Sequence, residues 1–294
     1  MWALHAVTGQ VIWSVAVDGE VKSSPLIVSF EGGGIDKAPA PGSEHEGEVE
    51  YAVVGSYDGF VYILDIQTGL CLDKCQSGGS IFASPVITHD CGRSKDLCVA
   101  TTSGDVLQVV VKLADDKKRG PSIEILSRYS MNTPIFSTPL YCSTTDSVLC
   151  CGVDGSLHCL NSGGNGLWTN NITASSIFSS PALCSGDMDA EVGSSFVVGA
   201  HDGIVRKIGC ESGAIVWAED VSATVFGTPF CTSSSEVIVS TTAGKIVVLD
   251  CNNGRILAET ELNAEIYSSV IVSRNTIFVG CRDDFIYCIN KIAR

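Results

Sequence analysis

Thiol and imidazole groups are the side chains in this sequence with the widest chemical scope. The chain has 14 cysteines among its 294 residues, and its five histidines are scattered, at His5, His45, His89, His158 and His201. No histidine accompanies a Ser or Cys in the sharp turn that presents a catalytic nucleophile. Cys71 and Cys75 are four residues apart in a predicted strand, which separates them by roughly 13 Å, too far for one tetrahedral zinc ion. We therefore predict no catalytic centre, no metal site and no cofactor.

Hydroxyl and aromatic groups form a second set, because they recur in short opening segments such as Ile-Phe-Ser-Ser-Pro at residues 177–181. The hydroxyl residue before the Pro position is Ser24, Ser84, Thr138, Ser180, Thr228 or Ser269. Three residues before the Pro position stand Phe82, Phe136, Phe178, Phe226 and Tyr267, with Lys22 in the first segment. These rings either pack between neighbouring sheets or rim a mouth that holds a peptide, an acyl chain or a prosthetic arm.

The elements that position these groups follow from the repeat. Most opening segments precede a Val-rich run that often ends in Gly, a turn that is Asp-Gly in three repeats, a second apolar run, a second turn that contains Gly and a run that often holds Trp. Such turns between apolar runs indicate hairpins, so every repeat supplies four short strands. Four-stranded units repeated at this period predict an all-β fold, the β-propeller of four-stranded blades. A linear β-solenoid is the alternative, but its rungs are shorter.

The repeat also sets the boundaries. We predict one propeller domain over residues 1–294, with a partial blade at 1–17, five full repeats from about 22 to 262 and an incomplete last blade at 263–294. We predict surface loops for the insertions at residues 31–48, 114–122 and 185–195. The predicted strands number 25, where six closed blades need 24. The chain is therefore either six blades with a surplus first strand or a truncated seven-bladed ring whose first strands lie upstream.

The first strand of each blade should lie innermost, so the hydroxyls of the opening segments are expected to form a ring there. The Asp-Gly turns lie on the same face and bring Asp58, Asp154, Asp202, Asp283 and Asp284. Aspartate forms turns through hydrogen bonds to its own backbone, and we interpret these residues as turn formers rather than ligands.

Composition restricts the partners. The net charge of −15 and the pI near 4.6 oppose nucleic-acid binding, which needs a clustered basic face. No run is apolar enough to span a membrane, and the first residues lack the pattern of a signal peptide. Most cysteines lie inside apolar runs, as expected for reduced core thiols. These features predict a cytoplasmic protein with no nucleic-acid or membrane partner.

Segments such as residues 6–13 (AVTGQVIW) and 211–217 (ESGAIVW) resemble the repeat of pyrroloquinoline-quinone propellers, with Trp four residues after a Thr-Gly or Ser-Gly turn. In quinoprotein dehydrogenases a vicinal disulfide stacks on the quinone, and Cys150-Cys151 is a vicinal pair. This resemblance makes a quinone-dependent dehydrogenase one alternative. The chain departs from the pattern where Asp73 and Ala258 replace Trp, and the family's calcium and catalytic-base motifs are not recognisable. Pyrroloquinoline quinone is therefore not expected.

A closer resemblance covers nearly the whole chain. Residues 266–270 (IYSSV), 277–289 (IFVGCRDDFIYCI) and 79–85 (GSIFASP) look like the carboxy-terminal quinone-type propeller of the β-alanine-activating enzymes, within the acyl-activating enzyme family. In that family an AMP-forming adenylation domain and a phosphopantetheine carrier domain do the chemistry. The resemblance implies that this chain is the accessory propeller alone, and we predict that it is a non-catalytic scaffold or docking propeller. Its partners would be those adenylation and carrier domains or other proteins. A free-standing protein-assembly scaffold is the remaining alternative.

Overall fold

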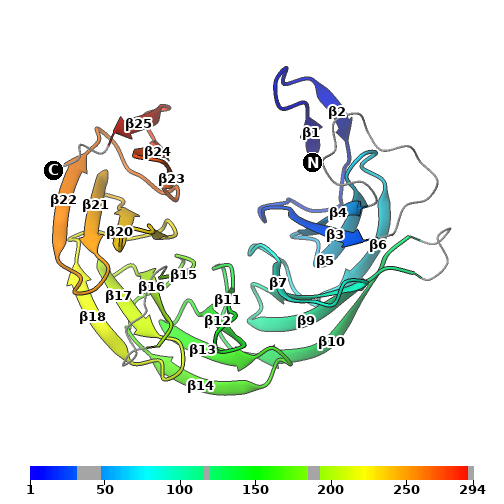
Figure 1. The fold of residues 1–294 in the computed structure, drawn as a ribbon, viewed down its shortest axis with the longest axis horizontal. Coiled ribbons are helices and arrows are strands. Elements are labelled where there is room, and N and C mark those ends of the chain that lie inside the picture. The colour runs from blue at the N-terminus through cyan, green and yellow to red at the C-terminus, as the bar shows by residue number, and fades with distance from the viewer. Residues whose placement is uncertain (32–47, 115–119, 185–192, 291–294) are drawn as a thin grey trace. The chain divides into compact units, whose positions relative to one another are not determined.

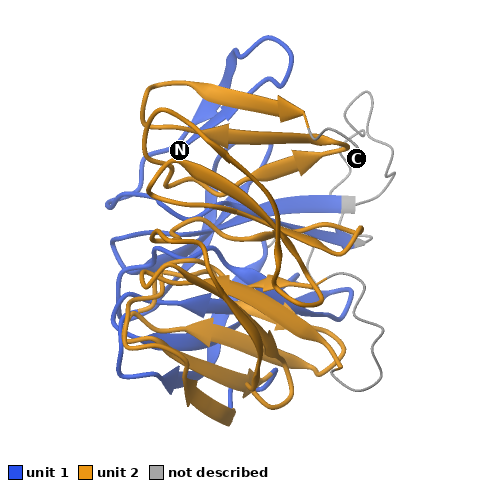
Figure 2. Cartoon of the chain, turned by 90° about the vertical axis from the view of Figure 1, so that its left-hand side faces the viewer, with its two compact units in different colours: residues 1–134, 162–165 blue, residues 135–161, 166–294 orange. Residues whose placement is uncertain are grey.

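The computed structural model describes residues 1–31, 48–114, 120–184 and 193–290. Within these residues the chain forms 25 strands and no helix, arranged in seven sheets. It divides into two compact units, coloured separately in Figure 2: unit 1 holds residues 1–134 and 162–165, and unit 2 holds residues 135–161 and 166–294. The predicted surface loops fall mainly on residues 32–47, 115–119 and 185–192, which lie outside the described part.

Unit 1 contains one two-stranded and two four-stranded sheets. Its strands are β1 (Trp2–Leu4) and β2 (Val11–Ser14); β3 (Leu26–Glu31), β4 (Glu48–Gly55), β5 (Phe60–Asp65) and β6 (Cys71–Gln76); and β7 (Val86–Asp90), β8 (Ser94–Ala100), β9 (Asp105–Lys112) and β10 (Ser122–Ser130).

Unit 2 contains three four-stranded sheets and one three-stranded sheet. Its strands are β11 (Leu140–Cys142), β12 (Ser147–Cys151), β13 (Ser156–Asn161) and β14 (Gly166–Asn171); β15 (Ala182–Leu183), β16 (Ser195–Gly199), β17 (Ile204–Gly209) and β18 (Ile215–Asp220); β19 (Phe230–Cys231), β20 (Glu236–Ser240), β21 (Lys245–Asp250) and β22 (Ile256–Glu261); and β23 (Ile271–Ser273), β24 (Thr276–Gly280) and β25 (Ile286–Asn290).

Each complete sheet is an antiparallel meander whose strands pair in chain order. In three of these sheets the predicted Asp-Gly turns join the second and third strands, and Gly59, Gly155 and Gly203 take φ of 82°, 84° and 78°. These left-handed conformations favour glycine, which has no Cβ. The short turn fixes the register, for example Gly199 opposite Val205 across β16 and β17.

The core of each unit lies between successive sheets. In unit 1, buried Val53, Ile63, Val99 and Val109 pack together from two sheets. In unit 2, each of three apolar clusters joins residues of neighbouring sheets. In the complete sheets the second and third strands are largely buried on both faces, as in β12 and β13, whereas the fourth strand β18 is mostly exposed. Burial of both faces explains why the sequences of the middle strands are continuous apolar runs.

The expected position of the first strands is borne out in unit 2. There β11 contacts β15, and β15 contacts β19. Figure 1 shows β11 and β15 on the inner side of their sheets, with β14, β18 and β22 on the outer side. The segments that precede first strands are therefore neighbours of one another.

The structure confirms the all-β fold of four-stranded blades. Five sheets have four strands, while the first and last in chain order have two and three. The segment treated as surplus in the six-bladed alternative forms β1, in which Trp2 pairs with Ser14 and Ala3 with Trp13. The seven sheets thus match the seven-bladed alternative in number. None of the described residues belongs to a helix that is long and apolar enough to cross a lipid bilayer.

Candidate functional site

The opening segments stand immediately before first strands, as predicted. Their first residue is fully buried in five repeats: Ile81, Ile135, Ile177, Val225 and Ile266. In two repeats this residue packs on the glycine that ends the second strand of the preceding repeat. A Cβ on Gly55 would lie 2.3 Å from Ile81, and one on Gly199 would lie 2.3 Å from Val225. Glycine is therefore required there by the close approach of two sheets.

The predicted hydroxyl residues link neighbouring opening segments through hydrogen bonds. The Ser84 hydroxyl accepts a hydrogen bond of 2.9 Å from the Ser24 backbone N–H in unit 1. In unit 2, Ser180 accepts from the Thr138 N–H and Ser269 from the Thr228 N–H, again at 2.9 Å. These three hydroxyls thus each accept a backbone N–H from the same position one repeat earlier. This gives them a structural role that does not depend on a ligand.

A second hydroxyl position, one residue earlier, was not singled out from the sequence. Ser23 donates to the Gly55 carbonyl (2.8 Å) and accepts from the Gly55 N–H (3.1 Å). Ser268 makes the same pair of bonds with Gly280, at 2.9 and 3.2 Å. The recurring small residue before the Ser or Thr was the available sequence signal. It ties the opening segment to the second strand of its own sheet.

The predicted aromatic residues of unit 2 form one continuous row. Ring centroids are 5.2 Å apart for Phe136 and Phe178, 5.3 Å for Phe178 and Phe226, and 5.1 Å for Phe226 and Tyr267. We call this row, together with His201 and Arg282, the aromatic row. Tyr267 is 38% exposed and the three phenylalanines are half-buried. The rings therefore do pack between neighbouring repeats, and they also present apolar area at the surface.

The two remaining predicted site residues of this type lie in unit 1. Phe82 is 38% exposed and meets the Tyr57 ring edge-on, with centroids 6.3 Å apart. Lys22, which replaces the aromatic residue, forms an ion pair of 2.8 Å with Glu20. This pair raises the pKa of Lys22 through a hydrogen bond and a charge interaction. Because the lysine is well exposed, the pair contributes little to stability.

His201 and Arg282 were missed because their positions look unrelated in the linear sequence. Each directly precedes the Asp of a turn between second and third strands. The His201 ring stacks on Phe178 at 4.9 Å and meets Phe226 at 4.5 Å, while the Arg282 guanidinium lies 4.4 Å above the Tyr267 ring. Their shared position, one residue before the turn Asp, is the sequence signal that could have identified them.

Backbone hydrogen bonds hold these turn residues in place. The His201 N–H donates to the Ser176 carbonyl (2.9 Å), and the Thr224 hydroxyl donates to the His201 carbonyl (3.0 Å). The buried Nε2 of His201 has no hydrogen-bond partner among the described residues. Burial lowers the pKa of His201 below its ordinary value of 6.5. The ring therefore stays neutral near pH 7.

The acidic turn residues act as turn formers. Asp58 accepts the Phe60 N–H (3.0 Å) and the Tyr62 hydroxyl (2.7 Å). Asp283 likewise accepts from Phe285 and Tyr287. Asp202 accepts from Ile204 and pairs with the buried guanidinium of Arg206 at 2.6 Å. Hydrogen bonds to Arg206, Thr173 and Ile204 outweigh burial and lower the pKa of Asp202. These carboxylates are satisfied within their own repeats.

Tryptophans and the glycine-containing turns between third and fourth strands form another connection between neighbouring sheets. The indole N–H of Trp13 donates to the Ile66 carbonyl (2.8 Å), that of Trp168 to Cys210 (3.0 Å) and that of Trp217 to Cys251 (2.8 Å). Each indole lies on the turn glycine of the next repeat, respectively Gly69, Gly213 and Gly254. Where Asp73 replaces Trp, its carboxylate instead accepts the Ile123 N–H at 2.9 Å.

All 14 cysteines are free thiols, including the vicinal pair. Cys150 and Cys151 are consecutive residues of β12, so their side chains point to opposite faces of the sheet. Both are buried, and burial raises the pKa of Cys151 to about 12. In the described part of the chain, no three His, Cys, Asp or Glu side chains gather so as to hold a metal ion.

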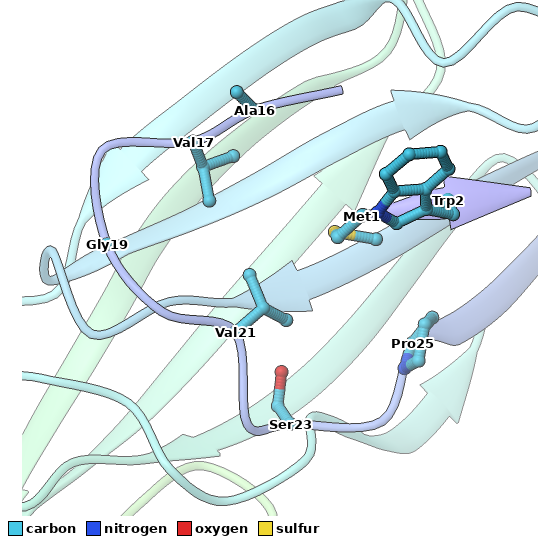
Figure 3. Close-up of a pocket in the computed structure, with 8 residues that line it drawn as sticks. All are labelled: Met1, Trp2, Ala16, Val17, Gly19, Val21, Ser23 and Pro25. Carbon is cyan, nitrogen blue, oxygen red and sulfur yellow. The ribbon is translucent and has the colours of Figure 1, made fainter. Parts of the chain in front are cut away.

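A cavity of about 400 Å³ lies in unit 1, and Figure 3 shows its lining. The lining residues are Met1, Trp2, Ala16, Val17, Gly19, Val21, Ser23 and Pro25. Its serine hydroxyl is already bonded to Gly55. Most of the side chains that line the cavity are apolar, and they do not indicate a class of ligand.

Solved structures share the fold. BamB from Moraxella catarrhalis matches 96% of this chain and 77% of its own, with a TM-score of 0.66 and 19% identity. Sqt1 from Saccharomyces cerevisiae matches 82% of this chain and 68% of its own, with a TM-score of 0.69 and 15% identity. At these identities the likeness shows the β-propeller fold alone.

Curated relatives all carry one name. The beta-alanine-activating enzyme of Drosophila melanogaster is 26% identical over 308 residues, which cover 98% of this chain and 27% of the relative. That of Danio rerio is 34% identical over 97 residues, covering 31% of this chain and 8% of the relative. The chain thus spans about a quarter of the length of the fly protein. The family described as "Beta-alanine-activating enzyme, beta-propeller" matches residues 46–291. This chain therefore belongs to the β-propeller family of the beta-alanine-activating enzymes.

Proposed function

We propose that this chain is a non-catalytic scaffold or docking propeller for the adenylation and carrier domains of an acyl-activating enzyme. Its family membership and its 27% share of the fly relative support this reading, because the remaining length of that relative can hold the domains that the enzyme's name requires. In the proposal, residues 1–294 act as one domain in the cytoplasm. They bind protein, and no cofactor, nucleic acid or membrane takes part.

The aromatic row gives the main structural support for this proposal. Hydroxyls and carboxylates on the same face are engaged in backbone and turn contacts. The rings, by contrast, keep apolar area at the surface, and Arg282 at the end of the row has a side chain that is 67% exposed. Aromatic and arginine side chains supply most of the energy in protein interfaces, because they bury a large area at a small cost in entropy.

Arg282 supplies a polar contact beside this apolar area. Its guanidinium lies 3.6 Å from the Glu265 carboxylate. Among the described residues, this guanidinium donates no hydrogen bond. Its N–H donors therefore remain available to carbonyl or carboxylate oxygens of a partner. A protein surface that combines an apolar side chain with such an oxygen would match this end of the row.

A binding measurement with separated domains tests the proposal. The chain is titrated with the adenylation and carrier domains of a beta-alanine-activating enzyme from the same organism, and heat of binding is recorded. We expect saturable binding that Tyr267→Ala weakens about tenfold or more, a loss of about 1.4 kcal/mol. Ile256→Ala is the matched control, because Ile256 is 36% exposed but lies on the outer strand β22.

Two results would contradict the proposal. One is the absence of binding to either domain by the folded wild-type chain. The other is catalytic turnover, detected as dye reduction after addition of quinone and calcium, which would assign an enzymatic role to the propeller itself.

A further inference from the structure

Two repeats show how an opening segment contacts the sheet that precedes it. The side chain of Ile81 lies directly on Gly55, the last residue of a second strand, and the Ile81 N–H donates to the carbonyl of the following residue, Ser56, at 3.0 Å. Val225 lies in the same way on Gly199, and its N–H bonds the next carbonyl at 3.1 Å. The contact thus combines a buried aliphatic side chain with a backbone hydrogen bond.

The second residue of the opening segment makes the next contact with the same sheet. The Phe82 ring meets Tyr57 with centroids 6.3 Å apart, and the Phe226 ring meets His201 at 4.5 Å. Tyr57 and His201 each stand two residues after the glycine and directly before the turn Asp. An aliphatic residue and the aromatic residue after it therefore fit two fixed positions of the preceding sheet.

The last sheet in chain order offers both positions again. Gly280 ends its second strand β24, and Arg282 stands two residues later, directly before the turn Asp. A Cβ on Gly280 would meet only Ser268 of its own opening segment, at an ordinary contact distance of 3.6 Å, and its φ is not left-handed. Nothing in the described part of the chain therefore requires glycine there. Glycine within a sheet often marks the close approach of another backbone.

Burial shows that this position is uncovered. The residues opposite the two covered glycines, Val61 and Val205, are fully buried, whereas Ile286, opposite Gly280, is 81% exposed. Residues directly opposite across antiparallel strands share a face of the sheet. By this register the same face also carries Ile271, Phe278 and Cys288. We call these three residues, together with Gly280 and Ile286, the Gly280 face.

We propose that the Gly280 face binds an extended segment of another polypeptide in which Ile or Val is directly followed by Phe or Tyr. The aliphatic side chain lies on Gly280, its backbone N–H donates to the Cys281 carbonyl, and the aromatic ring lies against the Arg282 guanidinium. A small residue and then Ser or Thr follow, as in the opening segments. Binding at this face requires neither the adenylation nor the carrier domain, and it therefore goes beyond the proposed docking role.

The chemistry of the face favours such a segment. Its exposed side chains are apolar, with Ile271 64% exposed beside the more exposed Ile286, and exposed apolar patches mark interaction sites. Arg282 already lies 4.4 Å above the Tyr267 ring, and its side chain is 67% exposed, so that a second ring can pack against the guanidinium. A folded second copy cannot supply the segment, because the aliphatic residues of its own opening segments are fully buried.

A peptide titration tests the proposal. A fluorescein-labelled peptide with the sequence of residues 174–183 (ASSIFSSPAL) is titrated with the complete chain, and fluorescence anisotropy is recorded. We expect saturable binding that Gly280→Ala weakens about tenfold or more, because the added methyl group occupies the place of the aliphatic side chain. Gly209→Ala is the matched control, since a Cβ there would meet only Ser212, at 3.4 Å, and it should leave binding unchanged.

Substitutions in the peptide test the two contacts separately. The peptide with Ile177→Gly should lose binding to the wild-type chain. The peptide with Phe178→Ala should bind more weakly, and Arg282→Ala in the protein should then cause little further loss, because both changes remove one contact. Additive losses would contradict the pairing of the ring with the guanidinium.

Alkylation of native cysteines locates the bound peptide. Cys288 on the Gly280 face and Cys91 in unit 1 are both exposed. Saturating peptide should slow the reaction of Cys288 with iodoacetamide several-fold, as followed by mass spectrometry of digests, and leave Cys91 unaffected.

Circular dichroism checks that the variants are folded. The proposal is overturned if the folded wild-type chain does not bind the peptide, if Gly280→Ala binds it equally well, or if Cys288 is not protected. Self-association of the chain that Gly280→Ala abolishes would also overturn it, by assigning the face to a second copy. Neither enzyme domain is present, so these failures remain distinct from a failure of the proposed docking role.

Discussion

The α-carbon of Gly254 lies directly against the indole of Trp217, so that a methyl group on Gly254 would sit 2.7 Å from Trp217 Cε3. The same indole donates its N–H to the Cys251 carbonyl, three residues before the glycine. One side chain of the β15 to β18 sheet thus contacts and bonds a turn of the β19 to β22 sheet. Trp168 and Gly213 repeat the relationship one sheet earlier. These contacts fix the distance between neighbouring sheets.

Substitution of Gly254 should therefore destabilise the protein by two effects. At a φ of 77°, alanine costs about 1 kcal/mol in backbone strain. Displacement of the indole adds about 1–3 kcal/mol. Gly193→Ala is the control, because Gly193 has a φ of 63° but its nearest neighbour atom would be 3.8 Å away. Urea unfolding should show a clearly larger loss for Gly254→Ala. Equal losses would show that the indole contact contributes nothing.

The hydroxyl of Ser180 gives a second prediction. Ser180→Ala removes the acceptor for the Thr138 N–H and should lower the free energy of unfolding by about 1 kcal/mol. Exchange of the Thr138 amide hydrogen should become faster. Ser180→Thr keeps the hydroxyl, as Thr138 and Thr228 do at equivalent positions, and should restore both values. Unchanged stability in Ser180→Ala would instead favour a hydroxyl reserved for a ligand.

His201 predicts a pH dependence of stability. Its pKa in the folded protein lies below 6.5, so the unfolded chain binds the proton more readily. The free energy of unfolding should therefore decrease as the pH falls below about 6.5 toward the folded-state pKa, and this contribution should be constant above 6.5. The effect is moderate because His201 is only partly buried.

His201→Phe isolates this contribution, because phenylalanine continues the aromatic row and cannot be protonated. Urea unfolding of both proteins from pH 7.5 to 5 should give curves whose difference grows in favour of the variant as the pH decreases. His158, whose pKa burial also lowers, is present in both proteins and cancels. Parallel curves would mean that the His201 imidazole accepts its proton as easily in the folded state as in the unfolded one.

Local sequence patterns were sufficient for the strands and turns. Gly59 and Gly203 indicated hairpins because a turn with a left-handed residue favours glycine at that position. The alternation of apolar runs and turns then predicted the four-stranded unit. Local sequence patterns also predicted that Ser84, Ser180 and Ser269 precede first strands. Their hydrogen-bond partners could not be predicted, because each partner belongs to another repeat and depends on how closely two sheets approach.

Contacts between repeats could not be predicted for the aromatic row either. The sequence identified Phe178, Phe226 and Tyr267 as equivalent residues, but it left open whether the rings pack or bind. His201 was interpreted as one of several scattered histidines, because a single residue before a turn has no periodicity of its own. Its place between two phenylalanines follows from the turn that carries it, and that turn is held by Ser176 and Thr224 of the neighbouring loops.

Photo-crosslinking from the aromatic row tests the docking role most directly. Benzoylphenylalanine is placed at position 267 or, as the control, at position 256 on β22, and the folded chain is irradiated with the adenylation and carrier domains present. We expect a covalent product with one of these domains from position 267 and little or none from position 256. Equal crosslinking from both positions, or none from position 267 despite measurable binding, would contradict the assignment of the aromatic row as the docking surface.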